Sequence, residues 1–229
     1  FRGVLVEGWD YGWDGIWFGN GREFSFTRAY PDFDLEAVAG YARQRGVRLV
    51  GHHETGGNIA NYEAQLDDAL DLYERLGVDW IKTGYVADAG AIIACNADIA
   101  DPCAGQVMEW HDGQRQVQHH LHVVREAARH RIAINPHEPV KDTGLRRTYP
   151  NWVSREGARG QEYNAWSAFA NGGPDHDPTL VYTRMLSGPM DYTPGVLSLT
   201  GDNGVPFAST LAKQLGLYLA IYSPIQMAA

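Results

Sequence analysis

Short apolar runs and longer amphipathic stretches alternate along this chain, and the alternation predicts a repeat of strands and helices. Four apolar runs, each followed directly by a polar or aromatic cluster, occupy residues 3–6, 47–50, 78–81 and 131–134. Runs this short are typical of parallel strands that are buried on both faces. Apolar residues recur at helical spacing over residues 34–45, 60–76, 116–130 and 206–222. The pattern therefore predicts β/α units with a parallel sheet.

Residues at the ends of these segments refine the fold prediction. Asp34 is placed to cap the first helix, and Gly46 and Gly77 follow the first and second helices. No glycine-rich phosphate loop follows the first strand, which disfavours a dinucleotide-binding fold. Polar residues follow nearly every strand, as they do at the carboxyl-end face of a (β/α)8 barrel. We therefore expect one (β/α)8 TIM barrel domain over residues 1–229.

Charge and composition narrow the possible partners. The chain has 229 residues and a formal net charge of −9, and it contains no run of basic residues. Nucleic acids and anionic membranes attract clustered Lys and Arg, so neither is an expected partner. No apolar run reaches the length of a membrane span. The seven Trp and twelve Tyr suit either core packing or stacking against sugar rings.

Cys95 and Cys103 lie eight positions apart in a loop-like stretch. We expect them to form a short loop-closing disulfide, with two free thiols as the alternative. A disulfide would indicate an oxidising compartment, so we expect a periplasmic or secreted protein.

Two carboxylates stand at the ends of predicted strands, and each follows a histidine. Glu54 comes after His53, and Glu138 comes after His137. A carboxylate at a strand end of a barrel faces the mouth, where burial raises its pKa and neighbouring charges can lower it again. These two glutamates are therefore candidate catalytic residues, with a capping or surface role as the alternative for each.

Two further acidic residues, Glu156 and Glu162, lie within residues 153–163, which their glycines and arginines mark as a loop. Several carboxylates in one barrel mouth repel one another unless a cation lies among them. Carboxylate oxygens suit a hard ion such as Ca²⁺. Arg155 and Arg159 are the alternative counter-charges.

Eight motifs of this chain resemble, in the same order, those of glycoside hydrolase family 97. They are LVEGW at 5–9, GHHET at 51–55, IKTGY at 81–85, PHE at 136–138, RTYPN at 147–151, EGARGQEY at 156–163, GPMDYTPG at 188–195 and YSPIQMAA at 222–229. Any one motif would be a weak signal, but eight in order span the whole chain. The resemblance implies a (β/α)8 catalytic barrel, flanked in full-length members by an N-terminal β-sandwich and a C-terminal β domain.

The resemblance also implies which parts of that fold the chain contains. The start of the chain resembles the second barrel strand, so we expect the first strand and both flanking β domains to lie outside these residues. The barrel is then incomplete at its N-terminus. Residues 88–111 are longer than the usual loop after strand four, and we expect an insertion at the rim of the site.

The site roles follow from the same resemblance. Glu162 matches the general acid of the family, and Glu54 and Glu138 match the base carboxylates of its inverting branch. Glu138, Glu156 and Glu162 match calcium ligands, so Ca²⁺ is the expected cofactor. A further ligand in the family comes from the N-terminal β-sandwich, which makes that domain an expected partner.

Position 84 separates the two branches of the family. Retaining, α-galactosidase-like members carry a nucleophilic Asp on strand four, where this chain has Gly84. The resemblance therefore implies a calcium-dependent, α-glucosidase-like enzyme that hydrolyses α-glucosidic bonds of oligosaccharides with inversion. The alternatives are a retaining α-galactosidase of the same family and a carbohydrate-binding remnant without catalysis.

Several other residues near the strand ends are candidates for contact with a sugar. Those expected to bind substrate are His52, His53, Lys82, His137, Trp9 and Asp191. Trp13, Trp110 and Tyr192 are further candidate stacking surfaces, with core packing as the alternative. A zinc hydrolase that uses the three histidines is a competing hypothesis, but the His-x-His motif expected on a first strand is missing.

Overall fold

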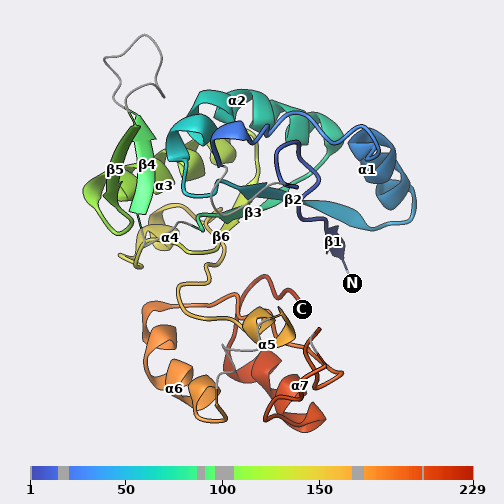
Figure 1. Ribbon diagram of the computed structural model, residues 1–229, viewed down its shortest axis with the longest axis vertical. Helices are drawn as coiled ribbons and strands as arrows, with labels where there is room; N and C mark the ends of the chain where they lie inside the picture. The colour runs from blue at the N-terminus through green and yellow to red at the C-terminus, as the bar shows by residue number, and fades with distance from the viewer. Residues whose placement is uncertain are drawn as a thin grey trace. The chain divides into compact units, whose positions relative to one another are not determined.

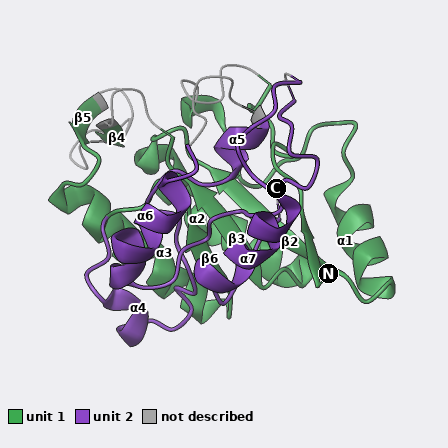
Figure 2. Ribbon diagram, turned by 90° about the horizontal axis from the view of Figure 1, so that it is seen from below, with its two compact units in different colours: residues 1–140 green, residues 141–229 purple. Residues whose placement is uncertain are grey.

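The computed structural model describes residues 2–14, 21–86, 91–95, 106–166, 173–202 and 204–228. The chain divides into two compact units, unit 1 over Phe1–Val140 and unit 2 over Lys141–Ala229 (Figure 2). Unit 1 contains a parallel sheet with its helices, and the elements described in unit 2 are short helices (Figure 1). A single domain over residues 1–229 stays a prediction.

Unit 1 is organised around four parallel strands. In spatial order they are β1 (Gly3–Leu5), β2 (Arg48–Glu54), β3 (Trp80–Gly84) and β6 (Ala133–Pro136). Every neighbouring pair in this sheet is parallel. The predicted β/α repeat is confirmed here, and the fold is mixed α/β with a mainly parallel sheet. The (β/α)8 barrel stays a prediction.

The polar clusters after the apolar runs belong to the strands themselves. β2 continues through His52 to Glu54, and β3 continues through Lys82 to Gly84. The register pairs His52 with Lys82 and Glu54 with Gly84. Side chains alternate between the two faces of a strand, so His52 and Glu54 share one face and His53 points to the other. The sheet thus carries a buried polar face at its carboxyl end.

Three helices pack beside the sheet and supply its core. They are α1 (Leu35–Gln44), α2 (Ile59–Leu76) and α3 (Gln114–Arg129) (Figure 1). As predicted, the Asp34 side chain accepts a hydrogen bond from the Ala37 amide at 2.8 Å, and Gly77 ends α2 with a φ of 72°. The buried core between helices and sheet includes Trp9, Phe26, Leu66, Leu70, Tyr73, Ile81 and Ile134.

A two-stranded hairpin follows β3, within the segment that the sequence predicts as a long loop. Its antiparallel strands are β4 (Ala91–Cys95) and β5 (Gln106–Trp110). The Ile93 amide donates to the Gly57 carbonyl at 2.8 Å, which ties β4 to the loop after β2. Strand β4 therefore lies beside the loop that follows β2, and an insertion at the rim of the site stays a prediction. The predicted Cys95–Cys103 disulfide lies outside the described residues.

Unit 2 has its own apolar cluster. Its elements are α4 (Leu145–Thr148), α5 (Glu162–Trp166), α6 (His176–Tyr182), the 3-10 helix η3 (Arg184–Ser187) and α7 (Leu211–Ala220). The buried cluster contains Leu180, Met190, Tyr192, Leu217 and Ile221. α7 is shorter than the predicted helix over residues 206–222, because Thr210 caps it by accepting from the Lys213 amide at 3.1 Å.

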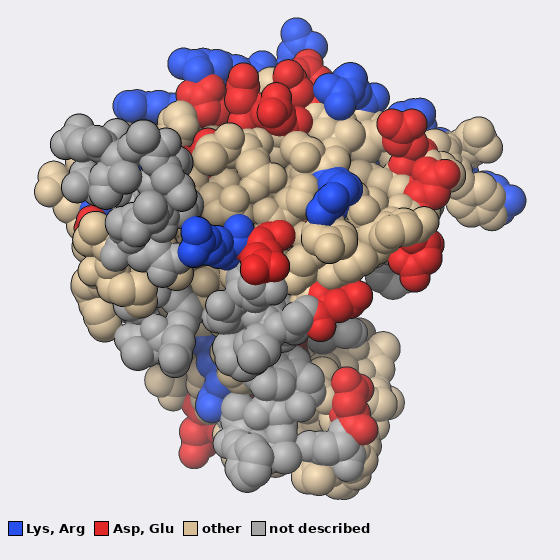
Figure 3. All heavy atoms as spheres, turned by 45° about the horizontal axis from the view of Figure 1, so that its top comes forward, with Lys and Arg blue, Asp and Glu red and all other residues tan. Residues whose placement is uncertain are grey.

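The surface of the described residues mixes charges of both signs. On the face shown in Figure 3, acidic and basic side chains are interspersed, and the described residues form no broad basic patch there. Among the helices of the described segments, none has the length and apolar character that a membrane crossing requires.

Candidate active site

The carboxyl end of the sheet in unit 1 holds a row of buried polar side chains. His52 is 2% exposed and Lys82 is 7% exposed, and the two lie side by side in the β2–β3 register. Lys82 Nζ lies 2.5 Å from Glu7 Oε1, and His52 Nε2 lies 3.9 Å from the same oxygen. These residues come from three separate strands or strand ends, so the sheet itself brings the predicted substrate-binding pair together.

His53 and Trp9, both predicted to bind substrate, lie in the core of unit 1. His53 Nδ1 is 2.9 Å from the Tyr62 hydroxyl, and its ring stacks on Tyr73 at 4.7 Å between centroids. Burial, with a smaller contribution from His52, lowers the pKa of His53 to about 3, so the ring is neutral. The Trp9 indole N–H donates to the His52 carbonyl at 3.2 Å. Their described contacts are those of core residues.

Glu54 is buried and held by main-chain donors. Its Oε1 accepts hydrogen bonds from the Gly56 amide at 2.8 Å and the Val86 amide at 3.1 Å. Burial, and next the nearby charge of Glu138, raise the pKa of Glu54 well above that of an ordinary glutamate, while the two amides and Lys82 oppose this rise. A carboxylate with a raised pKa accepts a proton more readily, as a general base must.

Gly84 leaves the space that Glu54 occupies. A Cβ atom added at Gly84 would overlap Glu54 Oε2. Position 84 therefore has no room for any side chain while Glu54 keeps its place. This arrangement can therefore hold the carboxylate of Glu54 or a carboxylate at position 84, but not both.

His137 and Glu138 follow β6 directly. The His137 amide donates to the Thr83 carbonyl at 2.7 Å, and His137 is 1% exposed. Glu138 has a φ of 42°, which is uncommon outside glycine. Its Oε2 accepts from the Tyr85 amide at 3.0 Å. This left-handed backbone is the kind of strain that persists at functional sites.

In unit 2, the segment with Glu156 and Glu162 is tied to the segment with Asp191. The Asp191 amide donates to the Arg155 carbonyl at 2.9 Å, and the Glu162 amide lies 3.3 Å from Thr193 Oγ1. Glu156 is 4% exposed and Asp191 is fully buried, whereas Glu162 at the start of α5 is partly exposed. The fold thus brings three predicted site residues onto two paired segments.

Arg184 binds both segments through their carbonyl oxygens. Its Nε donates to the Glu156 carbonyl at 2.9 Å and its Nη1 to the Gly188 carbonyl at 3.1 Å. Its Nη2 lies 3.2 Å from the Arg155 carbonyl and 3.1 Å from that of Pro189. One guanidinium therefore fixes the backbone around Glu156 and around the residues that lead to Asp191.

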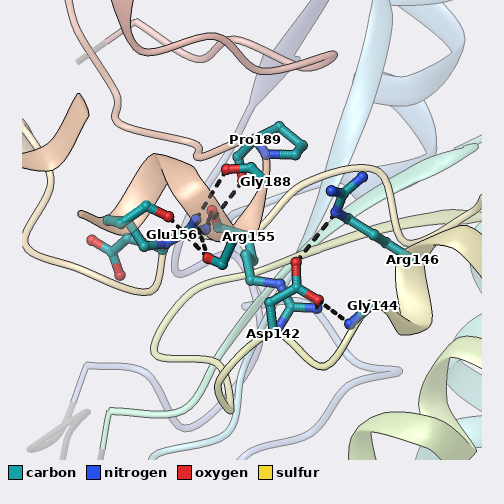
Figure 4. Close-up of polar contacts among 9 residues, drawn as sticks. Asp142, Gly144, Arg146, Arg155, Glu156, Gly188 and Pro189 are labelled. Atoms are coloured by element: carbon teal, nitrogen blue, oxygen red, sulfur yellow. Dashed lines mark hydrogen bonds and ion pairs between the residues drawn. The ribbon is translucent and has the colours of Figure 1, made fainter. Parts of the chain in front are cut away.

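Arg155 is buried beside Asp142. From the sequence, Arg155 was an alternative counter-charge for the carboxylates. Arg155 Nη2 lies 3.7 Å from Asp142 Oδ1, and the guanidinium lies 4.1 Å from the Trp152 ring. The Asp142 carboxylate also accepts from Arg146 Nε at 3.2 Å and from the Gly144 amide at 2.7 Å (Figure 4). These contacts give Arg155 a charge partner other than Glu156 or Glu162.

We expect Arg184→Gln to lower the free energy of unfolding by about 2–3 kcal/mol, because it leaves several partly buried carbonyls without their charged donor. Arg184→Lys should recover only part of this loss, since an ammonium lacks the planar fork. Urea unfolding of the intact protein measures both, with the exposed Arg147→Gln on α4 as control. An equal loss in Arg184→Gln and Arg147→Gln would contradict the expectation.

Several residues with clear roles in this geometry were not predicted from the sequence. Arg184 and Thr193 bind backbone atoms, and Tyr85 acts through its backbone amide. Such backbone contacts cannot be predicted from the types of these residues. Of these residues, Tyr85 would have been the easiest to predict, because it directly follows Gly84 at the end of a strand. His119 contacts Tyr85, and Glu63 contacts His119. Both lie on helices whose sequences are those of ordinary amphipathic segments.

Solved structures of known enzymes match the whole chain. A glycoside hydrolase family 97 enzyme from Pseudoalteromonas sp. strain K8, solved in complex with acarbose, is 55% identical with a TM-score of 0.91. A variant of that enzyme in complex with panose is 54% identical with a TM-score of 0.90. Each match covers 100% of this chain and 34% of the other.

The curated relatives are more distant. A protein named "Retaining alpha-galactosidase" from Bacteroides thetaiotaomicron is 25% identical over 98% of this chain and 30% of its own length. The chain thus spans about a third of the length of the proteins it matches. The family model "Glycoside hydrolase 97" matches residues 1–158, more than half of the chain. This chain belongs to glycoside hydrolase family 97.

Proposed function

We propose that this chain carries the catalytic carboxylates of a calcium-dependent, α-glucosidase-like enzyme that hydrolyses oligosaccharides with inversion. The observation that carries the proposal is the overlap between Glu54 and any side chain at position 84. A retaining enzyme of this family places its nucleophile at that position. Here the same volume holds a buried carboxylate with a raised pKa, which suits a base acting on water.

The comparisons support the substrate class. The relatives at 54–55% identity were solved with acarbose and with panose, and both ligands are oligosaccharides. Panose is a trisaccharide of α-linked glucose. The curated relative named as a retaining α-galactosidase is only 25% identical. The nearer relatives therefore favour an α-glucoside over an α-galactoside.

The mechanism divides the work among three glutamates. Glu162 donates a proton to the oxygen of the leaving group. Glu54 and Glu138 orient a water molecule and remove its proton as it attacks the anomeric carbon from the opposite side. Inversion requires about 6.5–9.5 Å between acid and base carboxyls, so that water fits between base and sugar. The Lys82 ammonium and the His52 ring are proposed to bind hydroxyl groups of the sugar.

Calcium is proposed as the cofactor, with Glu138, Glu156 and Glu162 as its ligands. The donor set fits the ion, because carboxylate oxygens are hard ligands and Glu156 is a buried carboxylate. Bound Ca²⁺ would supply positive charge that polarises substrate oxygens and orients the carboxylates. Glu138 belongs to unit 1, and Glu156 and Glu162 belong to unit 2.

Hydrolysis of an aryl α-glucoside by the intact protein, followed by proton NMR with calcium present, tests the proposal. We expect β-glucose to appear first, because water attacks the face opposite the leaving group. Initial α-glucose would mean retention, and the base roles of Glu54 and Glu138 would then be wrong.

A retaining α-galactosidase is the second candidate, and the name of the curated relative favours it. It predicts turnover of an aryl α-galactoside with α-galactose appearing first. A carbohydrate-binding protein without catalysis would bind oligosaccharides but turn over neither substrate. The same NMR experiment with both aryl glycosides separates the three outcomes.

A further inference from the structure

The short segment after β3 contacts both proposed base carboxylates through its main chain. The Tyr85 amide donates to Glu138 Oε2 at 3.0 Å, and the Val86 amide donates to Glu54 Oε1 at 3.1 Å. Two consecutive N–H groups therefore hold the two carboxylates. A shift of this segment would displace both together, and a misplacement of about 1 Å can cost a factor of about 100 in rate.

The Tyr85 side chain anchors this segment on the helix side of the sheet. Tyr85 is 1% exposed, and its ring lies edge-on to His119 at 5.3 Å and against His120 at 4.6 Å. Its hydroxyl lies 3.1 Å from His119 Nε2. The preceding residue, Gly84, has no side chain that could serve as an anchor.

His119 is held in turn by an ion pair between α2 and α3. His119 Nδ1 lies 2.7 Å from Glu63 Oε1, and Arg115 Nη1 donates to the same oxygen at 2.9 Å. Arg115 Nη2 also contacts Glu63 Oε2, so the arginine binds the carboxylate with both nitrogens. His119 is fully buried, and its ring has a partner at both nitrogens.

The protonation states of Glu63 and His119 determine which group donates and which accepts in each of these hydrogen bonds. Burial alone would raise the pKa of Glu63, but hydrogen bonds from His119 and Arg115 outweigh it and lower the pKa to about 2. Burial lowers the pKa of His119, so the ring is neutral. The Glu63 carboxylate only accepts, so His119 Nδ1–H donates to it and Nε2 accepts from the Tyr85 hydroxyl.

We propose that Tyr85, His119 and Glu63 form a positioning chain that keeps the two N–H groups of residues 85–86 aimed at Glu138 and Glu54. The inference rests on the proposed function of those carboxylates as the base. The three residues act through the backbone of the strand end and contact no reacting atom. Their loss should therefore lower kcat and leave KM nearly unchanged.

A second glutamate–histidine pair joins the same two helices and provides a matched control. His130, which caps the end of α3, has its Nδ1 2.9 Å from Glu74 Oε2 on α2. This pair is nearer the surface, with the Glu74 side chain 49% exposed. If Glu63 and His119 only tied α2 to α3, the two pairs would have equivalent effects on activity.

The test compares Tyr85→Phe, His119→Gln and their double variant in the intact protein with an oligosaccharide substrate. We expect each single variant to lower kcat about tenfold with KM changed by less than about twofold. The double variant should lose no more than either single one, because both break the same chain. Glu74→Gln and His130→Gln should keep kcat.

Unchanged kcat in Tyr85→Phe would overturn the inference, as would multiplied losses in the double variant or an equal loss in the control pair. If His119→Gln does not fold, Tyr85→Phe still decides, because it removes one hydroxyl and keeps the packed ring. Glu138→Gln separates this inference from the proposed function. Full activity in that variant would overturn the base assignment itself, whatever the Tyr85→Phe result.

Discussion

Replacing Gly84 by alanine is expected to lower kcat about a hundredfold and to lower the free energy of unfolding by about 1–3 kcal/mol. The added Cβ would overlap Glu54 Oε2, so the carboxylate must move away from the Gly56 and Val86 amides that donate to its Oε1. Weakening these buried hydrogen bonds accounts for the loss of stability. The loss of activity is larger, because the displaced carboxylate is the proposed base. Kinetics on an oligosaccharide and urea unfolding measure the two effects separately.

Gly40 offers a matched control for this substitution. It lies within α1, and a Cβ added there meets no atom within 4 Å. Gly40→Ala should keep kcat and stabilise the protein by about 0.5–1 kcal/mol, as alanine does within a helix. Full activity in Gly84→Ala would show that the described place of Glu54 is not needed for the reaction.

Glu162→Gln is expected to lower kcat by about three orders of magnitude on an oligosaccharide, because the leaving sugar then departs without a proton. The loss should be far smaller on 2,4-dinitrophenyl α-glucoside, whose leaving group needs no protonation. Steady-state kinetics on both substrates measure the difference.

Glu54→Gln is the complementary variant. Loss of a base slows the attack of water whatever the leaving group, so both substrates should slow to a similar extent. An equal loss on both substrates in Glu162→Gln would contradict the acid role and assign Glu162 a structural or metal-binding part instead.

Periodicity predicted the regular part of unit 1 well. The four apolar runs and three helical stretches mark β1, β2, β3, β6 and α1 to α3. Burial of a strand on both faces leaves a continuous apolar run, and burial of one helix face leaves apolar residues at a period of 3.6. The β4–β5 hairpin was missed, because residues 88–111 carry glycines and polar residues that read as a loop. α7 was predicted too long, because Pro206 looked like a helix start and Thr210 supplied the actual cap.

The sequence predicted which residue types of the candidate site stand at strand ends, but it predicted their geometry less well. His52 and His53 look equivalent in the sequence, yet strand alternation sends one to the polar face and the other into contact with Tyr62 and Tyr73. Gly84 stood out by resemblance, but the reason for a glycine there became clear only from the position of Glu54. Contacts between distant segments leave no local pattern.

The binding of Arg184 to main-chain oxygens has a consequence for how the sequence of this protein can vary. Every residue type presents the same carbonyl, so the contacts of Arg184 with the carbonyls of residues 155 and 156 do not depend on which side chains stand at those two positions. Substitutions at those positions can alter ligand chemistry while the loop path stays the same. A substitution of Arg184 would instead disturb the backbone of this region whatever those side chains are. Selection should therefore act separately on Arg184, which fixes the backbone, and on the side chains that determine the chemistry.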